Sequence, residues 1–173
     1  VLRSAARSAR GIGIAVVGLG LLAAALLLAI DTGPGHRFVA NQIGAYETAS
    51  GMTVKVGRIE GSIYGRMTLI DLRVRDPQGV FASAPALTVD WRPFAYLHKR
   101  IDVRELAAPQ VIFLRKPALK PTPSDPNAPT LPDIDLRLEH LRIDRFDLRA
   151  PVTGQRHVVR VVGAAAIADG RAQ

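Results

Sequence analysis

The first pattern in the chain is an apolar run at residues 11–30 that contains no charged or polar side chain. About 20 apolar residues are what a helix needs to cross roughly 30 Å of hydrocarbon. The flanking charges are those of Arg3, Arg7 and Arg10 before the run and Asp31 after it. Under the positive-inside rule, they predict a single-pass signal anchor in a bacterial inner membrane. Residues 1–10 are then a basic cytoplasmic tail, and the remainder of the chain is periplasmic.

A cleaved signal peptide is the alternative interpretation of the same run. The apolar core of a signal peptide is typically about 7–15 residues long and is followed by small residues at the cleavage site. This core is longer, and its alanines at residues 23–25 lie inside it. The pattern therefore favours an uncleaved anchor.

The next pattern has the spacing of an α-helix. The sequence at residues 32–35, Thr-Gly-Pro-Gly, interrupts the first helix, and Gly51 is a typical C-terminal stop. The apolar residues between them that recur at helical intervals are Phe38, Val39, Ile43 and Tyr46. Residues 31–51 are thus expected to contain a short juxtamembrane amphipathic helix, which either lies on the lipid surface or caps the domain behind it.

From Met52 onward the period changes from 3.6 to 2, and each segment has one apolar and one charged face. The strand-like segments cover residues 54–57, 70–75, 87–91, 101–104, 111–114, 134–148 and 158–167. Turn signals separate them at residues 57–65, 76–79 and 108–109. This alternation is typical of a half-buried antiparallel sheet. We expect a mainly β fold, with a first sheet region at residues 52–116 and further strands at residues 133–173.

Two connecting segments have other patterns. Residues 92–100 predict one or two helical turns with Phe94 and Leu97 turned inward. Residues 117–132 are rich in proline and polar residues, which predicts a flexible loop. The chain lacks an initial methionine and stops just past a strand-like run, so we expect it to be part of a longer protein.

The net charge of +8 raises the question of an anionic partner. Nucleic acid is not expected, because the arginines are scattered through strand-like segments, few aromatic residues are present, and the domain is predicted to be periplasmic. Anionic lipid headgroups or acidic protein surfaces fit better. The absence of cysteine excludes disulfides, thiolate metal sites and cysteine nucleophiles.

The sequence contains no pattern typical of a catalytic, cofactor or metal site. The histidines are far apart and have no H-x-x-x-H spacing: His36, His98, His140 and His157. The serine in the segment Gly61–Gly65 is at the wrong place for a nucleophile elbow, so a turn is the better interpretation. The neighbouring carboxylates at residues 133 and 135, and at 144 and 147, alternate with apolar residues as on a solvated strand face. We therefore predict a protein that is not an enzyme and has no cofactor.

Three motifs together carry a resemblance to a known family. They are the G-x-x-x-G of Gly61–Gly65, the L-x-D-L-x-V-x-D-P-x-G string of Leu69–Gly79, and the D-W-R-P-F segment of Asp90–Phe94. With these motifs, residues 36–117 resemble the N-terminal region of the translocation and assembly module family TamB, part of the AsmA-like group of bacterial inner-membrane proteins. Members of that family are far longer, and the C-terminal domain that meets the outer-membrane partner is absent from this sequence.

The resemblance implies a curled β-sheet whose concave face is a hydrophobic groove across the periplasm. The groove would transfer phospholipid from the inner membrane toward the outer membrane. An apolar track allows this because each CH₂ group of an acyl chain that is buried on it contributes about 0.8 kcal/mol of favourable free energy. The candidate groove-lining residues are Val54, Val56, Ile70, Leu72, Val74, Leu87, Val89 and Trp91. An ordinary closed core of the same side chains is the alternative.

The resemblance also supports a second function in outer-membrane biogenesis and protein secretion. The chain would then be an assembly factor that acts with an outer-membrane barrel protein. Exposed strand edges would pair with strands of client β-barrel proteins or autotransporters, and no lipid would be carried. The two hypotheses differ in what touches the sheet, which is a lipid in the first and a polypeptide in the second.

Overall fold

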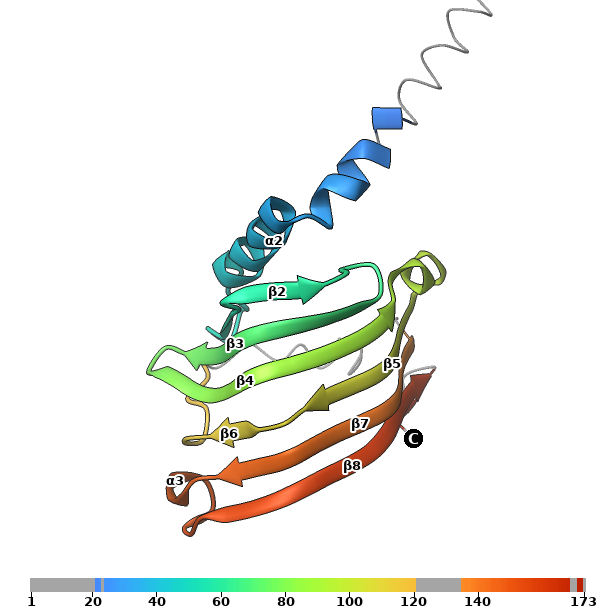
Figure 1. Ribbon diagram of the computed structural model, residues 1–173. Coiled ribbons are helices and arrows are strands. Elements are labelled where there is room, and N and C mark those ends of the chain that lie inside the picture. The colour runs from blue at the N-terminus through green and yellow to red at the C-terminus, as the bar shows by residue number, and fades with distance from the viewer. Residues whose placement is uncertain (1–20, 23, 121–134, 169–170, 173) are drawn as a thin grey trace, which may run out of the picture.

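The computed structural model describes residues 21–22, 24–120, 135–168 and 171–172, and these form one sheet with helices at its margins (Figure 1). Residues 24–30 are helical. The elements that follow are α2 (Gly33–Ala45), β1 (Thr53–Lys55), β2 (Arg58–Gly61), β3 (Arg66–Asp76), β4 (Gly79–Arg92), η1 (Pro93–His98), β5 (Arg100–Ala108), β6 (Val111–Phe113), β7 (Asp135–Leu148), α3 (Ala150–Thr153), β8 (His157–Ala168) and β9 (Arg171–Ala172). The expected mainly β fold is confirmed.

The nine strands form one sheet in the order β1-β3-β4-β5-β7-β8-β9, with β2 paired to β3, and β6 between β4 and β7. Most neighbours are antiparallel, but β7 runs parallel to both β5 and β6. The expected antiparallel sheet is therefore confirmed in part, since the sheet is mixed and mostly antiparallel. Parallel neighbours need a long connection, and residues 114–134 provide it between β6 and β7.

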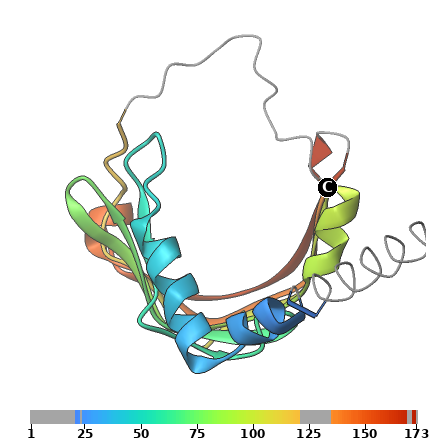
Figure 2. The ribbon, with the colours of Figure 1, turned by 90° about the horizontal axis from the view of Figure 1, so that it is seen from above.

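The sheet is a single layer that curves along the length of its strands. Seen from above, it forms a trough (Figure 2). Within the described ranges, α2 packs against β1 and β2, and the remaining packing is mainly between neighbouring strands. Among the described residues, the set of buried apolar residues is accordingly small: Ala40, Ile59, Phe81, Ala82, Ala84 and Ala108.

Irregular positions allow the long strands to bend. The register shifts between Val74 and Arg75 on β3, between Asp90 and Trp91 on β4, and at two places along β7. Such bulges increase the local twist and bend of a strand. A further interruption occurs at Asp71, which has a left-handed φ of 55°.

The helix α2 caps the β1 and β2 end of the sheet and is shorter than expected. It begins at Gly33, with Pro34 in its first turn, and ends at Ala45 because Tyr46 is extended. Proline is favourable in a first turn, so the Thr-Gly-Pro-Gly sequence starts this helix. A Cβ atom on Gly35 would collide with the backbone carbonyls of Ala29 and Ile30, which explains why the junction requires glycine.

The segment between β4 and β5 corrects one expectation. It forms the predicted helical turns, as the 3₁₀-helix η1. However, Phe94 is 65% exposed and Leu97 is 78% exposed, so neither side chain is turned inward. The physical reason is that the described residues place no second layer over the sheet at this end.

Two short elements were not predicted. The segment expected to be a turn at residues 57–65 contains β2, and the turn itself is confined to residues 62–65, after Gly61 with φ 88°. The helix α3 separates β7 from β8. Both are too short to show a clear period in the sequence.

The part of the chain that the structure describes contains no helix both long and apolar enough to cross a membrane. Residues 11–20 and 23 of the predicted anchor lie outside the described residues, as do Arg3, Arg7 and Arg10. The same holds for residues 121–132 of the predicted proline-rich loop.

Candidate functional site

A row of apolar side chains crosses the middle of the sheet. Cross-strand partners lie on the same face, and one row of partners consists of Met67 on β3, Val89 on β4, Leu106 on β5 and Leu141 on β7. A second row, two residues along β4, consists of Trp91, Val103, Leu138 and Ala165. Leu69 and Leu87 form a further apolar pair on the same side. We call the side of the sheet that carries these rows the apolar face.

The row between these two is charged and lies on the opposite side, which we call the charged face. Arg66, Asp90, Glu105 and His140 are successive partners across the four strands. Arg66 forms an ion pair with Glu105 at 2.9 Å, and Arg104 with Asp90. The sheet is therefore amphipathic across its full width.

The apolar face continues to the other end of the strands. The row there consists of Val54, Val74, Ala82, Phe113, Leu148 and His157. His157 and Gly163 lie an even number of residues apart on β8, and Gly163 is the partner of Leu141. Because side chains alternate along a strand, this row shares a face with the row that contains Leu141.

The structure brings six of the eight candidate groove residues to this face. They are Val54, Leu72, Val74, Leu87, Val89 and Trp91. Ile70 lies on the charged face, because it alternates with Leu69 and pairs with Arg58 and Ala86. The left-handed Asp71 follows it, so strict alternation does not extend through this point. Val56 lies in the connection after β1, beside α2.

The candidate groove list left out several residues of the apolar face, among them Met67, Leu69, Leu106 and Leu141. Met67 and Leu69 alternate with Thr68, a signal that was available but stood next to the expected turn. Leu106 follows the β5 register shift opposite Asp90 and Trp91, so simple alternation from Ile101 does not reach it.

The apolar face is open within the described residues. Its large side chains, such as Leu87, Val89 and Trp91, are neither fully buried nor fully exposed, because only their neighbours in the same layer shield them. The Trp91 indole Nε1 donates to the Ile63 carbonyl at 2.8 Å, so its one polar atom is satisfied while its rings stay on the face. An extended apolar surface of this kind is a typical site for an apolar ligand or partner.

A hollow of about 400 Å³ lies where α2 meets the edge of the sheet. Its lining residues are Gln42, Ile43, Tyr46, Thr48, Met52 and Val54. Since Val54 belongs to the apolar face, the hollow connects that face to α2. No charged side chain lines it.

The turn between β2 and β3 joins the sheet to the end of the helical segment at residues 24–30, which we call the apolar helix. The Asp31 carboxylate accepts hydrogen bonds from the Ser62 hydroxyl and from the Ile63 backbone N–H, both at 2.7 Å. These bonds lower the pKa of Asp31. The Tyr64 hydroxyl donates to the Leu27 carbonyl at 2.7 Å. The Gly61–Gly65 motif thus fixes the direction in which the apolar helix leaves the sheet.

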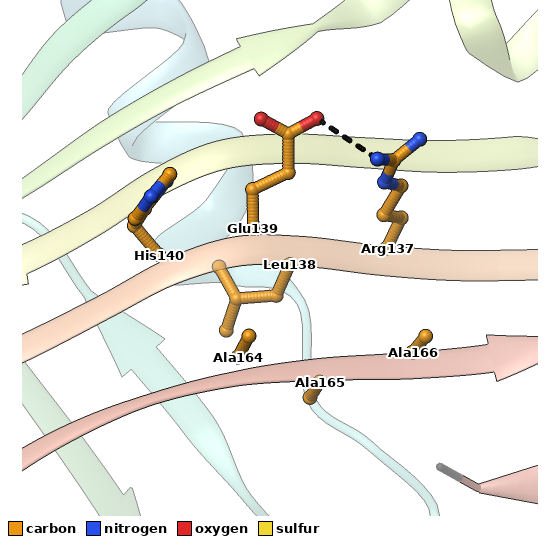
Figure 3. A pocket seen from close by; sticks show the side chains of 7 residues that line it. All are labelled: Arg137, Leu138, Glu139, His140, Ala164, Ala165 and Ala166. Carbon is orange, nitrogen blue, oxygen red and sulfur yellow. Dashed lines mark ion pairs between the residues drawn. The ribbon is translucent and has the colours of Figure 1, made fainter.

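A hollow of about 570 Å³ lies over β7 and β8. Figure 3 shows Arg137, Glu139 and His140 at this place, with Arg137 and Glu139 3.6 Å apart. The His140 ring instead lies 3.2 Å from the Arg104 carbonyl. Among the residues that the structure describes, no group of histidines and carboxylates could hold a metal ion. Arg137 and Glu139 belong to the ion pairs of the charged face.

A second charged cluster fixes the segment after β6. The Asp76 carboxylate has a fully buried side chain and accepts two hydrogen bonds from Arg115, at 2.7 and 2.6 Å. The backbone N–H groups of Gln78 and Ala118 donate to it as well. The Arg115 hydrogen bonds are the main reason why the pKa of Asp76 lies far below its ordinary value of 3.8.

We expect Asp76→Asn to lower the stability of the chain at neutral pH, with a thermal midpoint lower by several degrees. A lowered carboxyl pKa stabilises the folded state above the unfolded pKa, and this contribution is lost as the pH falls through the folded pKa. The difference in thermal midpoint between the wild type and the variant should therefore become smaller below about pH 4. Thermal unfolding between pH 3 and pH 7 measures it.

The matched control is Asp71→Asn, because Asp71 forms a surface ion pair with Arg73 and both side chains are 55% exposed. Exposed pairs contribute little to stability. A loss at pH 7 as large in Asp71→Asn as in Asp76→Asn would contradict the account.

The two faces, the α2 hollow and the turn at residues 62–65 make up the candidate site. The charged side chains behind the apolar face are paired with one another, as in Arg66 with Glu105 and Arg92 with Asp102. Comparison with protein-family models, with curated proteins and with solved structures finds no match to this chain.

Proposed function

We propose that this chain is the membrane-proximal module of a phospholipid conduit of the TamB type, anchored in a bacterial inner membrane. In this proposal the apolar face lines the inside of the trough and holds acyl chains. The chain acts as a binding surface and not as an enzyme, and inner-membrane phospholipid is its ligand. Residues 1–10 are cytoplasmic, and the sheet is periplasmic.

The observation that carries the proposal is the uncovered apolar face. Its middle row runs across β3, β4, β5 and β7, and neighbouring strands are about 4.8 Å apart, so the row is about 15 Å long. An acyl chain lying on it would gain about 0.8 kcal/mol of free energy for each CH₂ group removed from water. A closed core, the alternative, requires a second layer, and the described residues do not supply one.

The position of the face relative to the apolar helix supports the same function. Asp31 and Leu27, at the end of that helix, are bonded to the turn between β2 and β3. Trp91 of the apolar face donates to the Ile63 carbonyl in the same turn, so this end of the face lies next to the point where the chain would leave the membrane. A phospholipid entering from the bilayer would meet apolar side chains there first.

The edge strand β8 favours the assembly function as a second candidate. β8 pairs with β7 on one side, whereas β9 covers only Ile167 and Ala168 on the other. Three valines of this strand are among the exposed large apolar residues: Val158, Val159 and Val162. An open edge of this kind can pair with an extended client polypeptide, acting with an outer-membrane barrel protein.

Photo-crosslinking in cells separates the two functions. A photoreactive residue is placed at Leu72 or Val89 on the apolar face, with Arg73 on the charged face as the control, and adducts are identified by mass. Phospholipid adducts at Leu72 and Val89 but not at Arg73 are the expected result. Polypeptide adducts, or no adducts at the two apolar positions, would contradict the conduit and favour the assembly function.

A further inference from the structure

The helix η1 presents three large side chains to solvent at one tip of the molecule. Phe94 is 65% exposed, Tyr96 is 61% exposed and Leu97 is 78% exposed. The turn is well fixed, since Lys99 has a left-handed φ of 53° and its backbone N–H donates to the Tyr96 carbonyl at 3.0 Å. The Lys99 carbonyl in turn accepts a hydrogen bond from the Asp135 backbone N–H. The exposed side chains thus stand on a firmly connected support.

The charged residues within the segment that forms this tip have one sign, although Asp102 and Asp135 lie on the neighbouring strands β5 and β7. Residues 92–101 contain arginine, histidine and lysine but no acidic residue. Arg92 is engaged with Asp102 at 2.7 Å, and His98 and Arg100 are exposed. Aromatic and aliphatic side chains flanked by basic ones are typical of segments that lie in the headgroup region of an anionic bilayer.

The position of η1 agrees with such a contact. Figure 1 shows η1 on the side of the sheet from which the helical residues 24–30 leave it. Those residues include exposed leucines, such as Leu26 at 58% and Leu28 at 72%. The turn between β3 and β4, which contains Asp76 and Gln78, lies at the other end of the strands and carries no aromatic residue.

We propose that η1 inserts Phe94, Tyr96 and Leu97 into the headgroup region of an anionic phospholipid bilayer. The apolar helix would then be one attachment of the sheet to the membrane, and η1 a second. Two attachments fix the orientation of the trough relative to the membrane. With a single helix as its attachment, the trough could still rotate about the axis of that helix. This contact does not depend on lipid transport, because it concerns the outside of the β4–β5 connection.

The absence of cysteine in the chain allows a direct test with single labels. The environment-sensitive fluorophore NBD is attached in the full chain at Leu97→Cys, at Gln78→Cys as the remote control, or at Leu28→Cys as the membrane reference. The chain is reconstituted into phosphatidylglycerol vesicles with brominated acyl chains, which quench nearby fluorophores. We expect the Leu97 label to lose about half of its emission or more, as a label at the headgroup boundary should. The Gln78 label should keep its emission.

Neutral phosphatidylcholine vesicles give the second comparison, in which quenching at Leu97 should be weaker because the basic residues lose their partner. Equal emission at Leu97 and Gln78, with the Leu28 label quenched, would overturn the proposal and leave the conduit untouched. A Leu97 label that is shielded from water but not quenched would also overturn it, since it would indicate contact with protein. Loss of lipid adducts at Val89 would instead count against the conduit alone.

Discussion

Val89→Asp is expected to reduce phospholipid capture on the apolar face at least tenfold. Val89 stands in the middle of the row formed with Met67, Leu106 and Leu141. A carboxylate there either stays hydrated, which keeps acyl chains away, or is buried at a high cost in free energy. A loss of only about 1.4 kcal/mol of binding free energy already lowers occupancy of a weak site about tenfold. The measurement is the yield of phospholipid adducts at a photoreactive residue at Leu72.

Thr88→Asp is the matched control, because it places the same charge one residue earlier on the same strand. Thr88 lies on the opposite face, where its hydroxyl is 3.3 Å from that of Thr68 and its other partner is Ala107. Lipid capture should therefore remain close to that of the wild type. Equal losses in the two variants would show that the effect comes from the sheet as a whole and not from the apolar face.

Phe81→Ala is expected to destabilise the fold by about 3 to 4 kcal/mol, the usual cost of truncating a buried phenylalanine. Phe81 is 5% exposed, and its ring lies 6.0 Å from that of Phe113, which in turn lies 5.5 Å from Phe146. These rings join β4, β6 and β7, and β4 is separated from β6 in the chain by η1 and β5. A protein of this size has about 5–15 kcal/mol of stability, so the loss is a large fraction. Urea unfolding in a fixed detergent concentration measures it.

Phe94→Ala removes the same side chain from an exposed position and is the control for Phe81→Ala. Because Phe94 is 65% exposed, its loss should change the free energy of unfolding by about 0.5 kcal/mol or less. If Phe94→Ala destabilises the chain as much as Phe81→Ala, the side chain of Phe94 is packed in solution and the assignment of η1 to the surface is wrong.

Much of the sheet follows from the sequence, because alternation survives wherever a strand has one apolar face. The segments around Leu72, Val89 and Val103 are strands, and the Asp-Pro-Gln-Gly turn connects β3 to β4 as its residues predict. β7 was also visible as alternating residues on both sides of a register shift. Six of eight candidate groove residues share a face for the same reason.

The remaining features depend on contacts between distant segments. The left-handed φ of Asp71 separates Ile70 from Leu72, and a sequence pattern does not report a backbone angle. The parallel pairing of β7 with β5 joins segments about 35 residues apart, and alternation within each strand does not report it. The exposure of Phe94 and Leu97 follows from the absence of a covering layer at that end of the described sheet, which their helical spacing alone does not reveal.

The central claim is that acyl chains reach the apolar face, and Trp91 is the natural reporter for it. It is the chain's one tryptophan, and it belongs to the row with Val103 and Leu138. We would measure the fluorescence emission of Trp91 in the full chain, held in detergent, while phospholipid with brominated acyl chains is added. Saturable quenching that persists in Thr88→Asp and is lost in Val89→Asp is the predicted result. Emission that stays unchanged, or quenching that is equal in both variants, would contradict an open lipid-binding face.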